Sequence, residues 1–169
     1  VRGRHIGAAV ETFRNLFEIF HEDNADGAFL FLDQEKAYDR VSRQYLWRCL
    51  ARFGFPEEFV LTLRALYANI RANVMMDGWL TSDVDCSRGL RQGCPLSPML
   101  YNIANEPLAC ALRRSDEIRG LSPRGMPRFE LRISLFADDT CLFLRDVESL
   151  RAAMTILRQY SRASNARVN

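Results

Sequence analysis

Three aspartates stand next to strongly apolar segments, where carboxylates are uncommon. Asp33 directly follows the apolar run 28–32, and the pair Asp138-Asp139 lies between apolar residues at 133–136 and 142–144. Two adjacent carboxylates in apolar surroundings lose hydration and repel each other, so something must compensate for their charge. For the pair taken alone, a water-exposed turn and a divalent cation are equally good explanations.

The position of Asp33 favours the cation. Asp33 and Asp138 each lie at the end of a predicted strand, and two strands of one sheet can bring them together although they are far apart in the sequence. Carboxylates gathered in this way would hold two metal ions. Such a pair of ions activates an attacking hydroxyl and stabilises the leaving oxygen in a phosphoryl transfer.

The pattern of apolar residues predicts the helices and strands that must position these aspartates. Because the two kinds of element are mixed without regular alternation, the expected fold class is α+β. The expected helices cover about 7–21, 43–53, 56–67, 97–114 and 147–160, and the expected strands cover 28–32, 70–76, 79–86, 129–137 and 140–145.

Local signals refine several of these elements. The continuous apolar run 28–32 predicts a strand that is buried on both faces. Ser42 is predicted to cap a helix that buries Phe53, and Phe59 is predicted to face inward from the next helix. Asp77-Gly78 predicts a two-residue hairpin turn.

Composition limits the classes of function. The chain has 169 residues, of which 48% are hydrophobic and 26% charged, so it can bury a core. The net charge of +2 is too small to establish a nucleic-acid partner. Lys36 is the only lysine, and the other positively charged side chains are arginines, which can bind phosphate through two parallel hydrogen bonds. Five scattered cysteines fit neither a zinc site nor a disulfide framework, which favours a reducing compartment. No apolar run approaches the roughly 20 residues that span a bilayer.

Three segments, in this order, resemble the reverse transcriptases of non-LTR (LINE-type) retrotransposons. Residues 31–41 (FLDQEKAYDRV) are similar to the first catalytic motif of that family, and residues 136–139 (FADD) are similar to its later aspartate pair. Between them, residues 88–98 (RGLRQGCPLSP) and 100–103 (LYNI) resemble the long middle motif. The resemblance implies a right-hand polymerase fold of fingers and palm, with an antiparallel palm sheet packed on helices and the thumb absent. Residues 1–169 are then a partial reverse transcriptase domain.

The resemblance also implies a metal site and a reaction. Asp33 and Asp138 are expected to be direct metal ligands, Asp139 completes the catalytic cluster, and the backbone carbonyl of Gln34 is expected near the metal that holds the triphosphate. The expected cofactors are two Mg²⁺ ions, with Mn²⁺ as an alternative. The reaction implied is RNA-directed DNA polymerisation, in which a primer 3′-hydroxyl attacks the α-phosphate of a deoxynucleoside triphosphate.

Four residues are expected to contact the incoming nucleotide. In the family, the position of Tyr38 carries an aromatic ring that leaves no space for a 2′-hydroxyl, while an ordinary core aromatic is the alternative. Gln92 is expected to donate to the sugar or the template, and Gly93 to allow close approach of the backbone. Arg4 lies in a segment that resembles the family's Gly-Arg-Ser, with His5 in place of Ser, and is expected to contact the triphosphate.

Other charged residues of these motifs have open roles. Lys36 and Asp39 could form an ion pair that shapes the site, or a surface pair with little effect on stability. Arg88 and Arg91 could contact template phosphates or belong to a solvated loop.

Several alternatives to this function stay open. An RNA-dependent RNA polymerase also uses spaced aspartates, although Tyr38 and Ala137 favour DNA synthesis, and a group II intron-encoded reverse transcriptase is a variant of the same chemistry. A decayed, non-catalytic remnant that binds nucleic acid is an alternative from another class. A structural α+β domain with accidental acidic turns is a third.

The resemblance finally predicts partners and a location. The expected partners are an RNA template, a DNA primer and deoxynucleoside triphosphates, with no membrane. The chain stops at 164–169, where the family's next motif and its Lys would begin. We therefore expect a parent polyprotein that supplies a thumb and, in one alternative, an endonuclease. The expected location is intracellular, in the nucleus, the cytoplasm or both.

Overall fold

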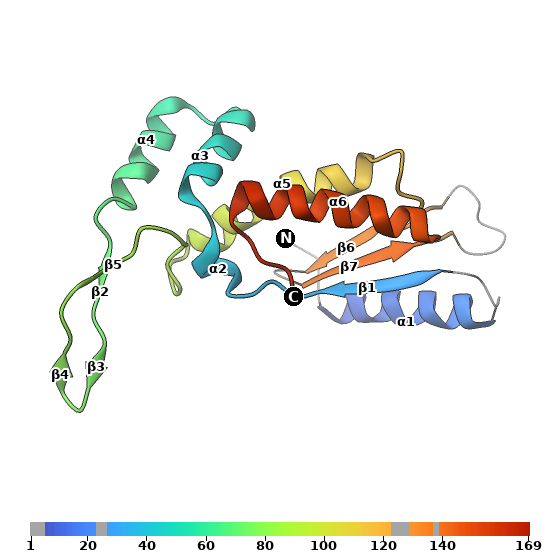
Figure 1. Cartoon of the computed structure of the whole chain (residues 1–169), viewed down its shortest axis with the longest axis horizontal. Helices are drawn as coiled ribbons and strands as arrows, with labels where there is room; N and C mark the ends of the chain where they lie inside the picture. The colour runs from blue at the N-terminus through green and yellow to red at the C-terminus, as the bar shows by residue number, and fades with distance from the viewer. Residues whose placement is uncertain (1–5, 23–26, 123–128, 137–138) are drawn as a thin grey trace.

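The computed structural model describes residues 6–22, 27–122, 129–136 and 139–169. A sheet with helices on both faces forms one part of the chain, and a pair of helices with a long hairpin forms the other (Figure 1). The elements are α1 (Ile6–Glu22), β1 (Ala28–Leu32), α2 (Ala37–Arg40), α3 (Arg43–Arg52), α4 (Glu57–Leu66), β2 (Arg71–Ala72), β3 (Met75–Met76), β4 (Trp79–Leu80), β5 (Val84–Asp85), α5 (Ser97–Arg114), β6 (Ile133–Phe136), β7 (Asp139–Leu144) and α6 (Val147–Ser164).

A three-stranded antiparallel sheet joins the segments that carry the candidate aspartates. Its strand order is β1-β7-β6. Leu32 of β1 pairs with Thr140 of β7, and Phe136 of β6 pairs with Asp139 of β7. The central strand β7 is the most deeply buried, because residues 142–144 are each only 1% exposed. The prediction of small antiparallel strands mixed with helices is therefore confirmed.

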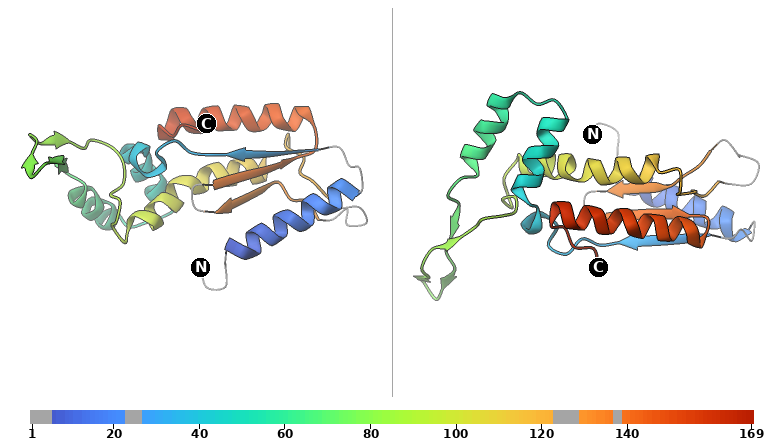
Figure 2. Two further views of the ribbon diagram at one scale, coloured as in Figure 1. Left: turned by 90° about the horizontal axis from the view of Figure 1, so that it is seen from below. Right: turned by 45° about the horizontal axis from the view of Figure 1, so that its top comes forward.

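Helices cover both faces of this sheet (Figure 2). Along β7, Leu142 and Leu144 point toward α5 and α6, while Phe143 points to the opposite face, because successive side chains of a strand alternate. On that opposite face Phe143 packs with Phe20 of α1 and with Leu121. The core between the sheet, α5 and α6 contains Leu32, Leu108, Leu112, Ile118, Leu142, Leu144, Ala152, Ala153, Leu157 and Tyr160.

The prediction that residues 28–32 are buried on both faces is wrong. Only Leu32 is fully buried, and Phe31 keeps 63% of its surface exposed. The physical reason is that the Phe31 side chain lies on the face of the sheet that α1 covers, and α1 covers this end of β1 incompletely. Phe13 of α1 contacts the Phe31 ring at 5.2 Å between centroids but shields it only in part.

A second core lies where α3 and α4 meet the first half of α5. Ser42 caps α3 as predicted, since its hydroxyl accepts a hydrogen bond from the Tyr45 N–H. Phe53 and Phe59, which were predicted to face inward, are 48% and 41% exposed. Phe53 is the residue that follows α3, and the Phe59 ring stacks on the half-buried Phe55 ring with centroids 5.4 Å apart. The buried members of this core are Val41, Leu46, Leu50, Leu63, Tyr67, Leu90, Leu100, Tyr101 and Ala104.

The predicted hairpin forms and projects from the chain (Figure 1). Asp77 and Gly78 have φ of 48° and 84°, as a two-residue turn with two left-handed positions requires. The arms pair twice, β3 with β4 next to the turn and β2 with β5 at the base. Every residue of these four strands is exposed, and Trp79 reaches 81%. Within the described residues, no helix is long and apolar enough to cross a membrane.

Candidate functional site

Two of the three candidate aspartates lie at neighbouring strand ends. The pairing of β1 with β7 ends at Leu32 and Thr140. Asp33 is the residue after Leu32, and Asp139 is the residue before Thr140. If the antiparallel register is continued by one residue, Asp33 falls opposite Asp139. Leu32 and Thr140 are buried toward the helices, whereas both aspartates are exposed on the other side of the pleat. Antiparallel pairing thus makes neighbours of two strand ends that carry carboxylates from distant parts of the sequence.

The C-terminal residues hold Asp33 from its other side. The Asn169 N–H donates to the Asp33 carbonyl at 2.9 Å, and the Asn169 amide donates to Asp33 Oδ2 at 3.2 Å. Gln34, which is only 6% exposed, forms an antiparallel bridge with Val168. The segment after α6 therefore begins to pair beside β1 and fixes the backbone that carries Asp33 and Gln34.

Part of the predicted metal site lies outside the described residues. Asp138 and Arg4 lie outside the described residues. Within the described ranges, which leave out Asp138, no three His, Cys, Asp or Glu side chains gather closely enough to hold a metal ion. Asp33 and Asp139 nevertheless fit a hard divalent cation, because both are exposed carboxylates on the same end of the sheet.

Tyr38 stands on a rigid support. It lies in α2, and its half-buried ring stacks on Tyr101 with centroids 4.7 Å apart and planes 16° from parallel. Tyr101 belongs to α5 and is 1% exposed. Lys36, which precedes α2, has φ of 48°, so a left-handed turn separates Asp33 from Tyr38. The packing of Tyr38 agrees both with a fixed ring beside a nucleotide and with a core aromatic.

The loop that leads to Gln92 packs closely against α2 and against the residues that follow α2. The Gly89 N–H donates to the Val41 carbonyl at 2.9 Å, and the Leu90 N–H donates to the Tyr38 carbonyl at 2.8 Å. Gly89 has φ of +82°, and a Cβ there would lie 2.6 Å from the carbonyl oxygen of Asp39. Glycine is therefore required at position 89 both for its backbone angle and for space.

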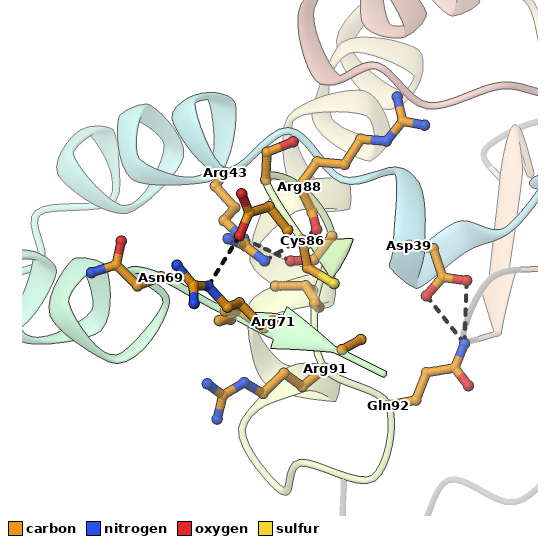
Figure 3. Close-up of a pocket in the computed structure, with 14 residues that line it drawn as sticks. Asp39, Arg43, Asn69, Arg71, Cys86, Arg88, Arg91 and Gln92 are labelled. Carbon is orange, nitrogen blue, oxygen red and sulfur yellow. Dashed lines mark hydrogen bonds and ion pairs between the residues drawn. The ribbon is translucent and has the colours of Figure 1, made fainter. Parts of the chain in front are cut away.

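Arg43 anchors the same loop from the start of α3 (Figure 3). Its guanidinium donates to the backbone carbonyls of Gly89 at 3.0 Å, Tyr67 at 3.0 Å and Arg88 at 3.1 Å. Burial lowers the pKa of Arg43, since a desolvated cation is less favourable. A planar fork of donors can satisfy several carbonyls at once, and Arg43 thereby ties α3, the end of α4 and the loop together.

Gln92 lies beside Asp39 at the edge of this loop (Figure 3). Its amide nitrogen donates to Asp39 Oδ1 at 3.2 Å and to Oδ2 at 3.4 Å. The predicted interaction of Asp39 with Lys36 is thus replaced by one with Gln92. Gly93 has φ of +78°, but a Cβ there would meet nothing within 4 Å. Gly93 is therefore favoured by its backbone angle, whereas the close approach of backbone occurs at Gly89.

A cleft of about 840 Å³ opens between the hairpin base, α3 and residues 87–92 (Figure 3). Arg43 and Arg71 line it but have partners: Arg43 bonds to backbone carbonyls, and Arg71 lies 3.3 Å from Asp83 and from Asp85. The cleft is also lined by Arg88 and Arg91, together with Gln92 and Asp39. Both arginines with open roles in the sequence therefore line the same cleft as Gln92, and the Arg91 guanidinium also donates to the Leu66 carbonyl at 3.3 Å.

Sequence reasoning missed three residues that shape this site. Gly89 and Arg43 carry no chemical signal of their own, because the need for each is set by backbone groups that are distant in sequence. Tyr101 lies in the middle motif, but nothing in the sequence indicates that its ring stacks on Tyr38. The glycine itself was the one available sign, since a glycine inside a motif can indicate an unusual backbone angle, and Gly89 does have a positive φ.

Comparisons with known proteins agree with the resemblance. Residues 4–169 match the family described as "Reverse transcriptase (RNA-dependent DNA polymerase)". The chain is 39% identical over 169 residues to the "Transposon TX1 uncharacterized 149 kDa protein" of Xenopus laevis, covering 100% of this chain and 13% of that protein. It is 27% identical over 159 residues to the "RNA-directed DNA polymerase from mobile element jockey" of Drosophila melanogaster, covering 93% of this chain and 15% of that protein.

A solved structure supports the fold. The structure of apo telomerase from Candida tropicalis, truncated from the C-terminal domain, covers 98% of this chain and 36% of its own, with a TM-score of 0.57 and 13% identity. The chain spans only 13% of the length of the TX1 protein, so it corresponds to a small part of that relative. Since the family match extends over nearly all of its residues, the predicted kinship with non-LTR retrotransposon proteins is confirmed, and the chain belongs to the reverse transcriptase (RNA-dependent DNA polymerase) family.

Proposed function

We propose that this chain is the fingers-and-palm segment of an RNA-directed DNA polymerase, a partial reverse transcriptase domain that spans residues 1–169. The observation that supports the proposal is the pairing of β1 with β7, whose register ends at Leu32 and Thr140, the residues next to Asp33 and Asp139 in the sequence. Asp138 stands next to Asp139 in the sequence and is the third proposed carboxylate. A water-exposed turn would explain the pair Asp138-Asp139, but it would not explain a carboxylate from a distant segment at the same end of the sheet.

The proposed metal site uses this end of the sheet. Asp33 and Asp138 are the proposed direct ligands of two Mg²⁺ ions, or of Mn²⁺ in their place, with Asp139 and the Gln34 carbonyl beside them. When bound, the ions supply the Lewis acidity that activates a primer 3′-hydroxyl and the charge that stabilises the pyrophosphate leaving group. The chain itself supplies rigidity, because the C-terminal segment hydrogen-bonds to the Asp33 backbone and side chain.

The remaining candidate residues form the nucleotide side of the site. Tyr38, held by its stack on Tyr101, is proposed to block a 2′-hydroxyl and so select deoxynucleotides. Gln92 and Gly93 are proposed to lie beside the sugar, on a loop that hydrogen-bonds to Tyr38 and Val41. Arg4 is proposed to contact the triphosphate.

The proposed partners follow from the reaction. An RNA template, a DNA primer and deoxynucleoside triphosphates are the substrates, and a thumb in the parent polyprotein would grip the duplex. We place the protein inside the cell, in the nucleus, the cytoplasm or both, where templates and nucleotides occur. The free state of all five cysteines fits a reducing compartment.

Primer extension on an RNA template tests the reaction. The protein should be assayed in its full reading frame with Mg²⁺ and with Mn²⁺. Asp33→Asn and Asp138→Asn should each abolish extension, because a carboxamide is a neutral and poorer ligand, whereas Asp116→Asn on an exposed loop should not. Incorporation that survives Asp138→Asn would contradict the assignment.

Sugar discrimination tests Tyr38 separately. Tyr38→Ala should raise ribonucleotide incorporation relative to deoxynucleotide incorporation by about tenfold or more, since it removes the ring that crowds the 2′ position. Unchanged discrimination in an active Tyr38→Ala protein would leave Tyr38 as a core aromatic. Efficient ribonucleotide addition by the unmodified protein would instead favour an RNA polymerase.

A further inference from the structure

The outer side of α6 carries a straight line of arginines. Arg151, Arg158 and Arg162 are exposed residues of this helix, and the exposed Thr155 lies between them. With about 3.6 residues per turn, the three arginines fall within about 40° of one another around the helix axis. With a rise of about 1.5 Å per residue, they form a line about 16 Å long, the α6 arginine stripe.

The α6 arginine stripe lies opposite the buried side of the helix. Leu157 and Tyr160 of that buried side share a core with Leu142 and Leu144 of β7. Figure 2 shows α6 on one side of the sheet and α1 on the other. The candidate aspartates are exposed on the face of the sheet that α1 covers. The stripe is therefore a surface separate from the candidate metal site.

The charge of the stripe is not neutralised by its neighbours. No ion pair joins its three arginines to a carboxylate of the described residues. Glu148, in the first turn, is the only acidic residue of α6. The neighbouring α3, which contacts α6 through the rings of Tyr45 and Tyr160 at 6.0 Å, has no acidic residue. Positive charge is thus concentrated on this side of a chain whose net charge is only +2.

Other exposed arginines differ in this respect. Arg14, Arg71 and Arg113 each have a carboxylate oxygen within 3.3 Å. Helix stability accounts for only one member of the stripe. Arg162 lies in the last turn, where a cation complements the helix dipole, but Arg151 and Arg158 lie in earlier turns.

The side chains of the stripe indicate the kind of partner. Guanidinium groups suit phosphate, which they bind through parallel hydrogen bonds. Proteins that hold single strands add aromatic rings on which the bases stack, but the only aromatic residue of α6, Tyr160, is 8% exposed and faces the core. A duplex keeps its bases inside and presents its phosphates outside, so it can be held by cations alone.

We propose that the α6 arginine stripe binds the phosphate backbone of a double-stranded nucleic acid, apart from any duplex held at the proposed polymerase site. Contacts to phosphates carry no sequence information, so the binding is independent of sequence. DNA and RNA duplexes share this backbone chemistry, and either can supply the partner.

Fluorescence anisotropy with labelled, blunt DNA and RNA duplexes tests the proposal on the protein in its full reading frame. The measured quantities are the dissociation constant and its dependence on salt. Replacing all three stripe arginines by glutamine should weaken binding by about tenfold or more near 0.1 M salt. It should also lower the slope of log K against log salt by about 2–3, because each phosphate contact contributes about 0.9. The duplex with the larger fall in affinity is the partner.

A matched control removes the same charge from other elements. Arg14→Gln, Arg64→Gln and Arg114→Gln together take three exposed arginines from α1, α4 and α5 and should change the slope by less than about 1. Replacing the stripe arginines by lysine keeps the charge and should retain most of the slope. If the triple glutamine variant does not fold, Arg158→Glu against Arg64→Glu makes the same comparison.

Three results would overturn the proposal. The first is an unchanged slope in the folded stripe variant, or an equal fall in the control. The second is an equally large loss of affinity for a single strand of the same length, which excludes a preference for duplex. The third is a loss of primer extension at saturating primer–template, which would assign the arginines to the polymerase site. The proposed function fails in a different way, through extension that survives Asp33→Asn.

Discussion

Replacing Gly89 by alanine is expected to destabilise the protein more than the same replacement at Gly54. The two glycines have almost the same backbone angle, with φ of +82° and +80°, which costs alanine about 1–2 kcal/mol. An added Cβ at Gly54 meets nothing within 4 Å, whereas at Gly89 it would lie 2.6 Å from the Asp39 carbonyl oxygen and 2.9 Å from the Asp39 Cα. The pair therefore shares the conformational cost and differs in the steric one.

The steric cost at Gly89 follows from the contacts that the loop must give up. A backbone oxygen cannot rotate away as a flexible side chain can, so the loop itself must move. That movement stretches the hydrogen bonds from Gly89 to Val41 and from Leu90 to Tyr38, which are 2.9 Å and 2.8 Å long. At about 0.5–1.5 kcal/mol each, their loss adds about 1–3 kcal/mol to the conformational cost. Gly89→Ala should then lower the free energy of unfolding by about 2–5 kcal/mol, against about 1–2 kcal/mol for Gly54→Ala.

Urea and thermal denaturation of the chain and both variants measure this difference. An extra loss of about 2 kcal/mol corresponds to a melting temperature lower by roughly 4–8 °C for a chain of this length. If the two variants agree within about 0.5 kcal/mol, the close contact with Asp39 has no energetic weight and the reasoning is refuted.

Two further predictions concern charged side chains. Arg43→Lys should lower the free energy of unfolding by about 1–2 kcal/mol, because each of the three carbonyls is met by a different guanidinium nitrogen, whereas the donors of lysine all lie on one nitrogen. Arg48→Lys on the exposed side of α3 should change it by less than about 0.5 kcal/mol, and equal losses in urea denaturation contradict the anchor. Asp146→Ala should lower the melting temperature, because Asp146 caps α6 through a bond from the Ser149 N–H at 2.7 Å. Hydrogen bonding with Ser149 lowers the pKa of Asp146 in the folded protein. The stabilisation by Asp146 is therefore fully present above the pKa of the unfolded chain, about 4, and is lost as the pH falls through the lowered pKa of the folded protein. A difference in melting temperature between the two proteins that persists at pH 2 would exclude this mechanism.

The elements of the fold were largely predictable because their signals are local. Ser97 and Arg114 bound α5 as expected, and the Asp77-Gly78 turn forms the expected hairpin. Periodicity and turn chemistry act over a few residues, so they survive in almost any tertiary setting. Burial was less predictable: Phe31, Phe53 and Phe59 are apolar yet exposed, because exposure depends on which neighbours a strand or helix finally receives.

For the candidate site too, some features follow from the sequence alone and others only from the tertiary structure. Sequence alone determined which residue types could do chemistry, since apolar flanks make Asp33 and Asp139 unusual wherever they lie. Only the tertiary structure decided that the strand ends next to them are neighbours, because the antiparallel register of β1 and β7 is a property of two segments that are far apart in the chain. It also decided that Asp39 pairs with Gln92 and that Gly89 admits no side chain. Those constraints arise from atoms of distant segments that folding brings within about 3 Å of each other, a distance that composition, motif and spacing do not encode.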